Sequence, residues 1–161
     1  MTDLLEWLEG SGLGGLARES LYGFQALVGI HILGLVFSFG MLLWVDLRML
    51  GVCVTGRRLS AVYGAFARWF VGGFAVMISS GVALFAGFAT SAYENTYFRI
   101  KMLVIVLAGV NALAFHVVLG RLPALADEGV PPAIVRLAGA LSIVFWITAI
   151  LCGRMMSYTL F

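Results

Sequence analysis

The sequence predicts an all-α integral membrane protein, a four-helix bundle preceded by a short amphipathic N-terminal interfacial helix. Of its 161 residues, 62% are hydrophobic and only 11% are charged. The mean hydropathy of +1.05 is far above that of a soluble domain. Four apolar stretches, at about residues 21–45, 66–89, 100–120 and 133–153, approach or exceed the ~20 helical residues that cross a hydrocarbon core.

The first 19 residues differ from the rest and are expected to form a separate interfacial segment, with the bundle at 20–161. The segment lacks the basic start and the apolar core of a signal peptide. Its apolar residues are spaced as on a short helix that lies on the membrane surface, interrupted by glycines. These apolar residues are Leu4, Leu5, Trp7, Leu8, Leu13 and Leu16.

Short polar connections at 46–58, 90–99 and 121–132 separate the apolar stretches, so neighbouring helices should run antiparallel. Basic residues gather around the first connection, whereas the N-terminal segment is mainly acidic. By the positive-inside rule the first connection is then cytoplasmic, and both termini lie outside. The residues compared are Arg48, Arg57, Arg58 and Arg68 on one side and Asp3, Glu6, Glu9 and Glu19 on the other.

Several functions are disfavoured by composition. The net charge of +2 gives no reason to expect nucleic acid as a partner. Cys53 and Cys152 lie in different segments and form no pattern typical of a disulfide framework or zinc site. The interiors of the spans are expected to hold no charged residue, which argues against an ion-coupled transporter. The expected surroundings are a lipid bilayer and either a membrane redox complex or further copies of the chain.

Two histidines are the strongest candidates for chemistry. His31 and His116 are the only histidines in the chain, and both fall on expected spans. Imidazole is the usual axial ligand of b-type haem, so both are candidate metal ligands. The alternative is that each histidine hydrogen-bonds across a helix interface, which contributes ~1 kcal/mol.

Other residues extend this candidate haem site. Gly34 and Ser38 share a helix face with His31, where small residues leave space for a porphyrin or let helices approach closely. Lys101 and Arg154 lie toward the same side and can pair with haem propionates. Asn111 is a further polar candidate that either orients a ligand or joins helices.

The expected span limits place the two histidines at different depths. His31 lies ~10 residues from the outer end of its span, whereas His116 lies ~7 residues before Pro123, near the inner end of its own. At 1.5 Å per residue the difference in depth is roughly 8–12 Å. Both histidines can ligate one porphyrin only if tilt or different span limits remove this gap. Otherwise each serves a separate site, or His31 alone is a ligand.

Five short patterns are spread along the chain after residue 20. They are formed by His31 and Gly34; Asp46, Arg48, Leu50 and Gly51; Phe98 and Lys101; Asn111, Phe115 and His116; and Gly153, Arg154 and Tyr158. With these patterns the chain resembles an uncharacterised family of small four-helix bacterial membrane proteins, a domain of unknown function. That resemblance implies a multi-pass protein of the bacterial inner membrane and brings no established activity.

The chain is more distantly similar to the HemJ-type protoporphyrinogen oxidases and to CopD-like copper-resistance membrane proteins. In the HemJ pattern a first-span histidine binds haem b, which corresponds to His31 here, and a later lysine and histidine correspond to Lys101 and His116. The Trp-Gly and Pro-Arg-Leu elements of that pattern are absent. Phe39-Gly40 and Asp46-Leu47-Arg48 stand in their places.

The leading hypothesis is a membrane b-type cytochrome-like protein that transfers single electrons between a quinone and a partner redox complex. The alternative is a cofactor-free accessory subunit that docks on a larger membrane complex. If the chain is an enzyme, we expect a haem-dependent membrane oxidoreductase acting on a porphyrin or a quinone. A Soret band in the purified protein distinguishes the haem hypotheses from the accessory subunit.

Overall fold

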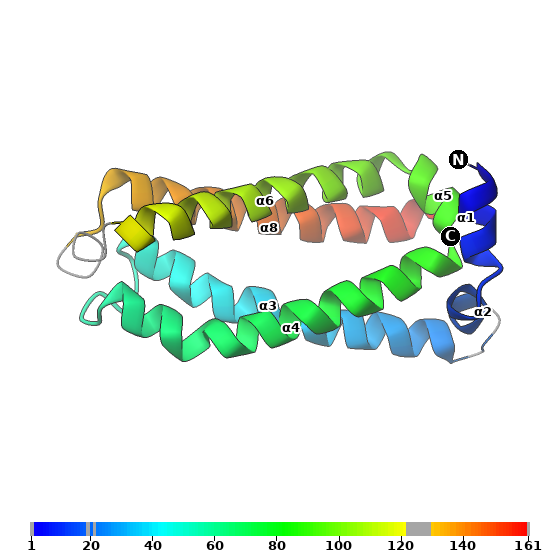
Figure 1. Cartoon of the computed structure of the whole chain (residues 1–161), viewed down its shortest axis with the longest axis horizontal. Helices are drawn as coiled ribbons and strands as arrows, with labels where there is room; N and C mark the ends of the chain where they lie inside the picture. The colour runs from blue at the N-terminus through cyan, green and yellow to red at the C-terminus, as the bar shows by residue number, and fades with distance from the viewer. Residues whose placement is uncertain (1, 19, 21, 122–129, 161) are drawn as a thin grey trace.

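The computed structural model describes residues 2–18, 20, 22–121 and 130–160, and these residues are helical apart from short connections (Figure 1). The predicted all-α fold with short N-terminal helices is confirmed. The helices are α1 (Thr2–Glu9), α2 (Gly12–Arg18), α3 (Gly23–Leu50), α4 (Leu59–Gly87), α5 (Ala89–Glu94), α6 (Thr96–Arg121) and α8 (Ala133–Leu160).

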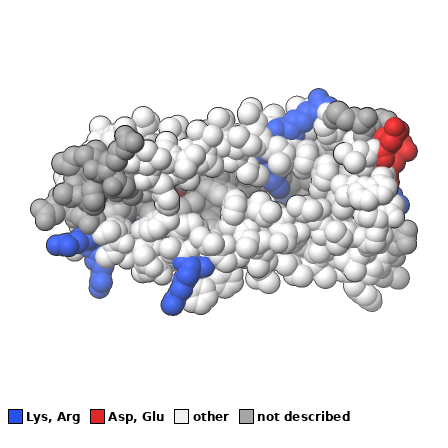
Figure 2. Space-filling view, viewed as in Figure 1, with Lys and Arg blue, Asp and Glu red and all other residues white. Residues whose placement is uncertain are grey.

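Four helices, α3, α4, α6 and α8, are long and apolar enough to cross a membrane. Their apolar side chains are largely exposed, as expected for surfaces that face lipid rather than water. Figure 2 shows one face that is mostly white, with basic side chains at separate places on it and acidic side chains mainly at one end. The chain is therefore a multi-pass membrane protein. The predicted connection 121–132 lies mostly outside the described residues.

The long helices form two antiparallel pairs. Helices α3 and α4 pack along their length, α6 packs on α8, and α3 also contacts α8 (Figure 1). The α3–α4 crossing is very close, because a Cβ atom on Gly34 would lie 2.7 Å from the backbone nitrogen of Met77. Gly73 makes the reciprocal approach to Ser38. Small residues at such a crossing let two membrane helices pack backbone to backbone.

The helices run past the limits expected from hydropathy. Helix α3 continues to Leu50 and ends at Gly51, whose φ of 74° is the left-handed conformation that commonly terminates helices. Helix α4 begins at Leu59 rather than near residue 66. A helix does not stop where its apolar run stops, because backbone hydrogen bonds continue through polar residues. The expectation that the spans hold no charged residue is therefore wrong, since Asp46 and Arg48 both lie in α3.

Helices α1 and α2 lie across one end of the bundle, which is called here the amino-terminal end (Figure 1). Glu9 fixes them there, because its Oε1 accepts a 2.8 Å hydrogen bond from the backbone N–H of Thr90. Glu9 also forms a 3.6 Å ion pair with Arg18. Leu4, Trp7, Leu13 and Leu16 remain exposed, in keeping with the predicted interfacial position of this segment. At the opposite end, called the loop end, buried residues of all four long helices form one apolar cluster.

Candidate functional site

His31 lies on α3 in the half nearer the amino-terminal end, and its ring is oriented by α4. The ring Nδ1 is 3.2 Å from the hydroxyl oxygen of Ser80. That hydroxyl has a single proton, which it donates to the backbone carbonyl of Val76 at 2.7 Å. Ser80 Oγ therefore accepts a hydrogen bond from Nδ1–H, and this fixes the ring tautomer. The second nitrogen, Nε2, is left unprotonated with its lone pair available, which is the state that binds metals.

Further contacts with α4 hold the same edge of the ring. The backbone carbonyl of Met77 lies beside the same serine, 3.1 Å from Ser80 Oγ. Gly81 leaves room for the ring, because a Cβ atom there would lie 3.1 Å from Cε1 of His31. The half-buried imidazole is thus held along the edge that carries Nδ1 and Cε1.

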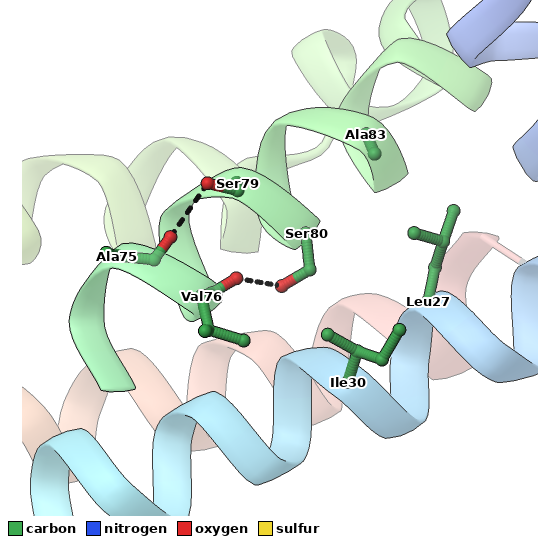
Figure 3. Close-up of a pocket in the computed structure, with 7 residues that line it drawn as sticks. All are labelled: Leu27, Ile30, Ala75, Val76, Ser79, Ser80 and Ala83. Carbon is green, nitrogen blue, oxygen red and sulfur yellow. Dashed lines mark hydrogen bonds between the residues drawn. The ribbon is translucent and has the colours of Figure 1, made fainter. Parts of the chain in front are cut away.

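A groove between α3 and α4 lies beside Ser80 (Figure 3). Its volume is about 420 Å³, and its walls are mostly apolar. The two serine hydroxyls that line it already donate to carbonyls of their own helix, Ser79 to Ala75 and Ser80 to Val76. The groove therefore offers a surface for an apolar chain rather than for a polar ligand. Its lining residues are Leu27, Ile30, Ala75, Val76, Ser79, Ser80 and Ala83.

Lys101 of α6 supplies a positive charge close to His31. The two side chains are near enough to interact electrostatically, and the ammonium nitrogen lies 3.6 Å from the point where a Cβ atom on Gly153 would stand. Among the described residues the ion pair is that of Arg18 with Glu9, and no carboxylate pairs with Lys101. A half-buried ammonium group in an apolar bundle is costly without an anion, so this position favours a negatively charged ligand group.

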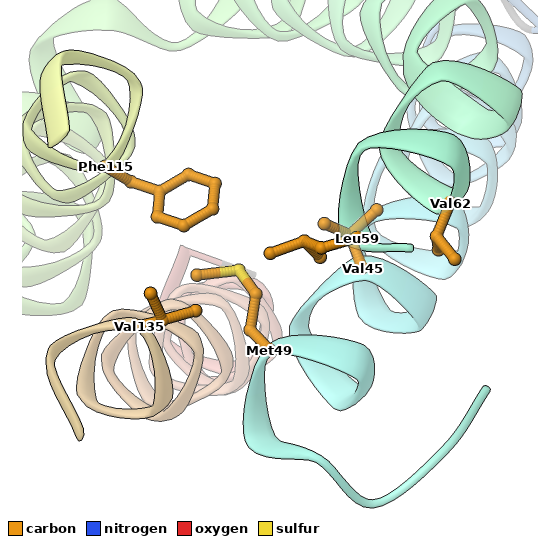
Figure 4. Packing of buried hydrophobic residues seen from close by; sticks show 6 residues of the cluster. All are labelled: Val45, Met49, Leu59, Val62, Phe115 and Val135. Atoms are coloured by element: carbon orange, nitrogen blue, oxygen red, sulfur yellow. The ribbon is translucent and has the colours of Figure 1, made fainter. Parts of the chain in front are cut away.

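His116 lies at the loop end and has a different environment. Its Nε2 is 2.9 Å from the hydroxyl of Tyr63 on α4, and the two rings meet edge to face at 5.4 Å. The preceding residue, Phe115, points inward to the apolar cluster of Val45, Met49, Leu59, Val62, Phe115 and Val135 (Figure 4). His116 is itself exposed. Its contacts are those of a histidine that joins two helices.

The two histidines lie too far apart to share one iron. Their partners Ser80 and Tyr63 are on the same helix, α4, and 17 residues separate them, which is about 25 Å along the axis at 1.5 Å per residue. Iron bound between two imidazoles needs both nitrogens within a few ångströms. The depth difference of 8–12 Å expected from sequence is too small, and the bridged alternative does not apply to this structure.

The remaining candidates occupy separate places. Ser38 is buried and donates to the carbonyl of Leu35, and with Gly34 it lies at the α3–α4 crossing, where the helices themselves fill the space. Asn111 joins α6 to α8, because its Nδ2 donates to the carbonyl of Ala138 at 2.9 Å. Arg154 bonds and stacks with Tyr158 of its own helix. Of the predicted set, the structure brings His31 and Lys101 together.

Two features of this region were missed from the sequence. Ser80 and Gly81 orient the His31 ring, yet they are 49 and 50 residues away in the chain. The signal that points to them is the Ser79-Ser80-Gly81 run, which interrupts an otherwise apolar stretch. Asp46 was assigned to a connection, although it is a buried residue of α3.

The fold and this site define a small four-span membrane protein with one oriented histidine inside its bundle. Residues 4–159 match the model of a family of unknown function, DUF6644, and the chain belongs to that family. The predicted resemblance to an uncharacterised family is thereby confirmed over nearly the whole chain. No curated protein and no solved structure matches the chain.

Proposed function

We propose that this protein binds b-type haem in the membrane through His31 and transfers single electrons between a quinone and a partner redox complex. The observation that carries the proposal is the orientation of His31. Ser80 holds the Nδ1 side of the ring, and Nε2 is left as a free nitrogen donor. Metal-bound histidines commonly show this arrangement, in which a second group fixes the tautomer and the orientation of the ligand.

The residues around His31 fit such a group in three respects. The imidazole presents a neutral nitrogen donor, which suits haem iron. Lys101 supplies a cation near that donor that pairs with no carboxylate of the described residues, and an ammonium group binds a propionate carboxylate as a point charge. Gly81 leaves room for the ring edge that carries Cε1 and Nδ1. Haem in this place would supply one-electron chemistry, with a potential that depends on the axial ligand and on the apolar surroundings.

The decisive experiment is haem analysis of the protein purified in mild detergent from a haem-sufficient host. We expect a Soret band and a positive pyridine haemochrome assay for the wild type. His31→Gly should abolish both, because the nitrogen donor is lost, and added imidazole should restore them by occupying the space of the missing ring. A merely structural role of His31 gives no such rescue.

His116→Ala is the matched control, because it removes the other histidine about 25 Å away along α4. The variant should keep the full haem content of the wild type. Ser80→Ala should keep the ligand but weaken haem binding by roughly 10–100-fold, as is usual when the group orienting a metal-bound histidine is removed. A wild-type protein without haem contradicts the proposal and leaves the cofactor-free accessory subunit. Equal loss in both histidine variants contradicts the assignment to His31.

A further inference from the structure

The groove between α3 and α4 opens on the lipid-facing surface of the bundle. Its wall residues Ile30 and Val76 are exposed. Along α4 the groove extends from Ala75 to Ala83, which is about 12 Å at 1.5 Å per residue. Because the core of a bilayer holds no water, an apolar groove on a membrane-spanning surface is filled by the hydrocarbon of a lipid. The residues next to the groove indicate which kind of lipid this is.

One cation is aligned with the groove. Arg68 lies seven residues before Ala75 on α4, so the two residues share a helix face about 10.5 Å apart. The Arg68 side chain is exposed, and among the described residues the ion pair is that of Arg18 with Glu9, so no carboxylate pairs with Arg68. An arginine on a membrane span extends its side chain toward the head groups, where phosphate is the available anion.

Two aromatic rings lie at the same level as this cation. The guanidinium carbon of Arg68 is 5.3 Å from the ring centroid of Trp69, and Trp69 stacks on Phe37 of α3 at 6.3 Å. Trp69 is seven residues before Val76, and Phe37 is seven residues after Ile30, so the ring pair stands two turns from both walls of the groove. Tryptophan is enriched at the head-group level of membranes. This level is therefore the expected position of a lipid head group.

The length of a lipid chain matches the distance from Arg68 to the groove. Gly72 lies between them on the same face of α4, and a Cβ atom there would meet nothing within 4 Å, so the path is open. The groove begins about 10 Å beyond Arg68 at Ala75 and ends about 22 Å beyond it at Ala83. The hydrocarbon of one leaflet is half of a ~30 Å core, or about 15 Å. A chain that starts at the level of Arg68 therefore ends inside the groove.

We propose that this face of α3 and α4 binds one anionic phospholipid of the leaflet at the loop end. The lipid phosphate pairs with Arg68, the glycerol region packs on Trp69 and Phe37, and an acyl chain fills the groove. The inference goes beyond the proposed function and does not depend on haem. Since Ser80 lines the groove and orients His31, the bound chain covers the contact that fixes the ring.

Charge favours an anionic lipid over other occupants of this face. Arg57 and Arg58 are exposed in the connection at the same end, and basic residues near a membrane surface attract anionic head groups. A second copy of the chain is disfavoured, because a two-fold contact through this face sets the same patch against itself and brings two Arg68 side chains together. A lipid without net charge gains no such attraction from these arginines.

The test measures lipid selectivity at Trp69 in a variant whose other tryptophans, Trp7, Trp44 and Trp146, are replaced by phenylalanine. The protein is placed in phosphatidylcholine nanodiscs that contain either phosphatidylglycerol or phosphatidylcholine with brominated acyl chains, which quench tryptophan on contact. We expect phosphatidylglycerol to bind at Trp69 about fivefold more tightly, the usual effect of one basic residue near an anionic lipid. A variant that keeps Trp7 alone, at the amino-terminal end, should show no such preference.

Substitutions at the two ends of the site test its two parts. Arg68→Gln should abolish the preference, because the phosphate loses its cation. Arg136→Gln, which changes another exposed arginine near the same end on α8, should leave the preference unchanged. Ala75→Leu should lower the relative affinity for phosphatidylglycerol several-fold, because the larger side chain fills the groove. Ala112→Leu, at an exposed position of α6, is its matched control and should have no effect.

Thermal unfolding of each variant shows that it folds, and the comparison of Trp69 with Trp7 needs no substitution at Arg68. Equal binding of the two lipids at Trp69 overturns the proposal. A preference as large at Trp7 as at Trp69 also overturns it, because that result reflects general attraction to the protein rather than a site. A folded Arg68→Gln protein that keeps the preference, or an unchanged affinity in Ala75→Leu, contradicts the proposed position of the lipid.

Discussion

The close crossing of α3 and α4 predicts a large difference between two adjacent glycines of α4. A Cβ atom added at Gly73 would lie 2.6 Å from the backbone nitrogen of Ser38, whereas one added at Gly72 meets nothing within 4 Å. Ordinary contact begins at about 3.4 Å. Gly73→Ala therefore forces the two helices apart by about 0.8 Å, because the atoms in the way belong to the backbone and cannot rotate aside.

The size of the effect follows from comparing the two variants. Each substitution gains the same helix propensity, up to about 1 kcal/mol for Gly to Ala, so this contribution cancels in the difference. The steric cost of overpacking remains, typically about 1–3 kcal/mol. For a chain of this length, each kcal/mol lost from the free energy of unfolding lowers the melting temperature by about 2–4 °C. We expect Gly73→Ala to melt several degrees below Gly72→Ala, with Gly72→Ala at or slightly above the wild type.

Thermal unfolding in mild detergent, followed by far-UV circular dichroism, measures this difference. Both variants are expected to fold, so the comparison is between two melting temperatures. If Gly73→Ala is as stable as Gly72→Ala, the helices do not cross at the distance found here. The orientation of His31 by Ser80 would then lose its support, because it depends on the same crossing.

Two further predictions concern topology and packing. With Cys53 and Cys152 replaced, a cysteine at position 12 should react with an impermeant thiol reagent in intact cells, and one at position 56 should not. The reason is that arginines border the first connection, which is then cytoplasmic. The reverse labelling pattern contradicts the proposed orientation. Trp146→Ala should lower stability by about 3–5 kcal/mol, as expected for a buried tryptophan. Trp69→Ala, at an exposed position, should cost much less in the same unfolding assay, and equal losses would refute the packing described for Trp146.

The fold was predictable because a membrane restricts the choices. Apolar runs of sufficient length must be helices, and short connections between them make neighbours antiparallel. The helix ends were not predictable in the same way. Helix α3 continues through Asp46 to Leu50, because hydropathy records where side chains become polar and not where backbone hydrogen bonding stops. Helix α5 begins at the last residue of a predicted span, and its other residues fall in the predicted connection 90–99.

The candidate site was predictable only in its rarest residues. His31 and Lys101 stood out because polar groups are scarce in the apolar stretches. Ser80 did not, since a serine gains meaning here only through the helix pairing that places it against a residue 49 positions away. Asp46 was lost to the misplaced helix end, although its carboxylate is buried within the bundle.

The histidines show why depth cannot be judged from separate span ends. From the sequence, the depth of His31 is counted from the start of one helix and the depth of His116 from the end of another, so errors in both helix limits affect the depth difference. In the structure a single helix, α4, contacts both rings, so the distance between the two sites can be counted along its axis. On it the partners of the two histidines are about 25 Å apart, which makes them independent sites. A haem bound at His31 must therefore take any second axial ligand from a group other than His116, and this explains why the two histidine variants are expected to differ.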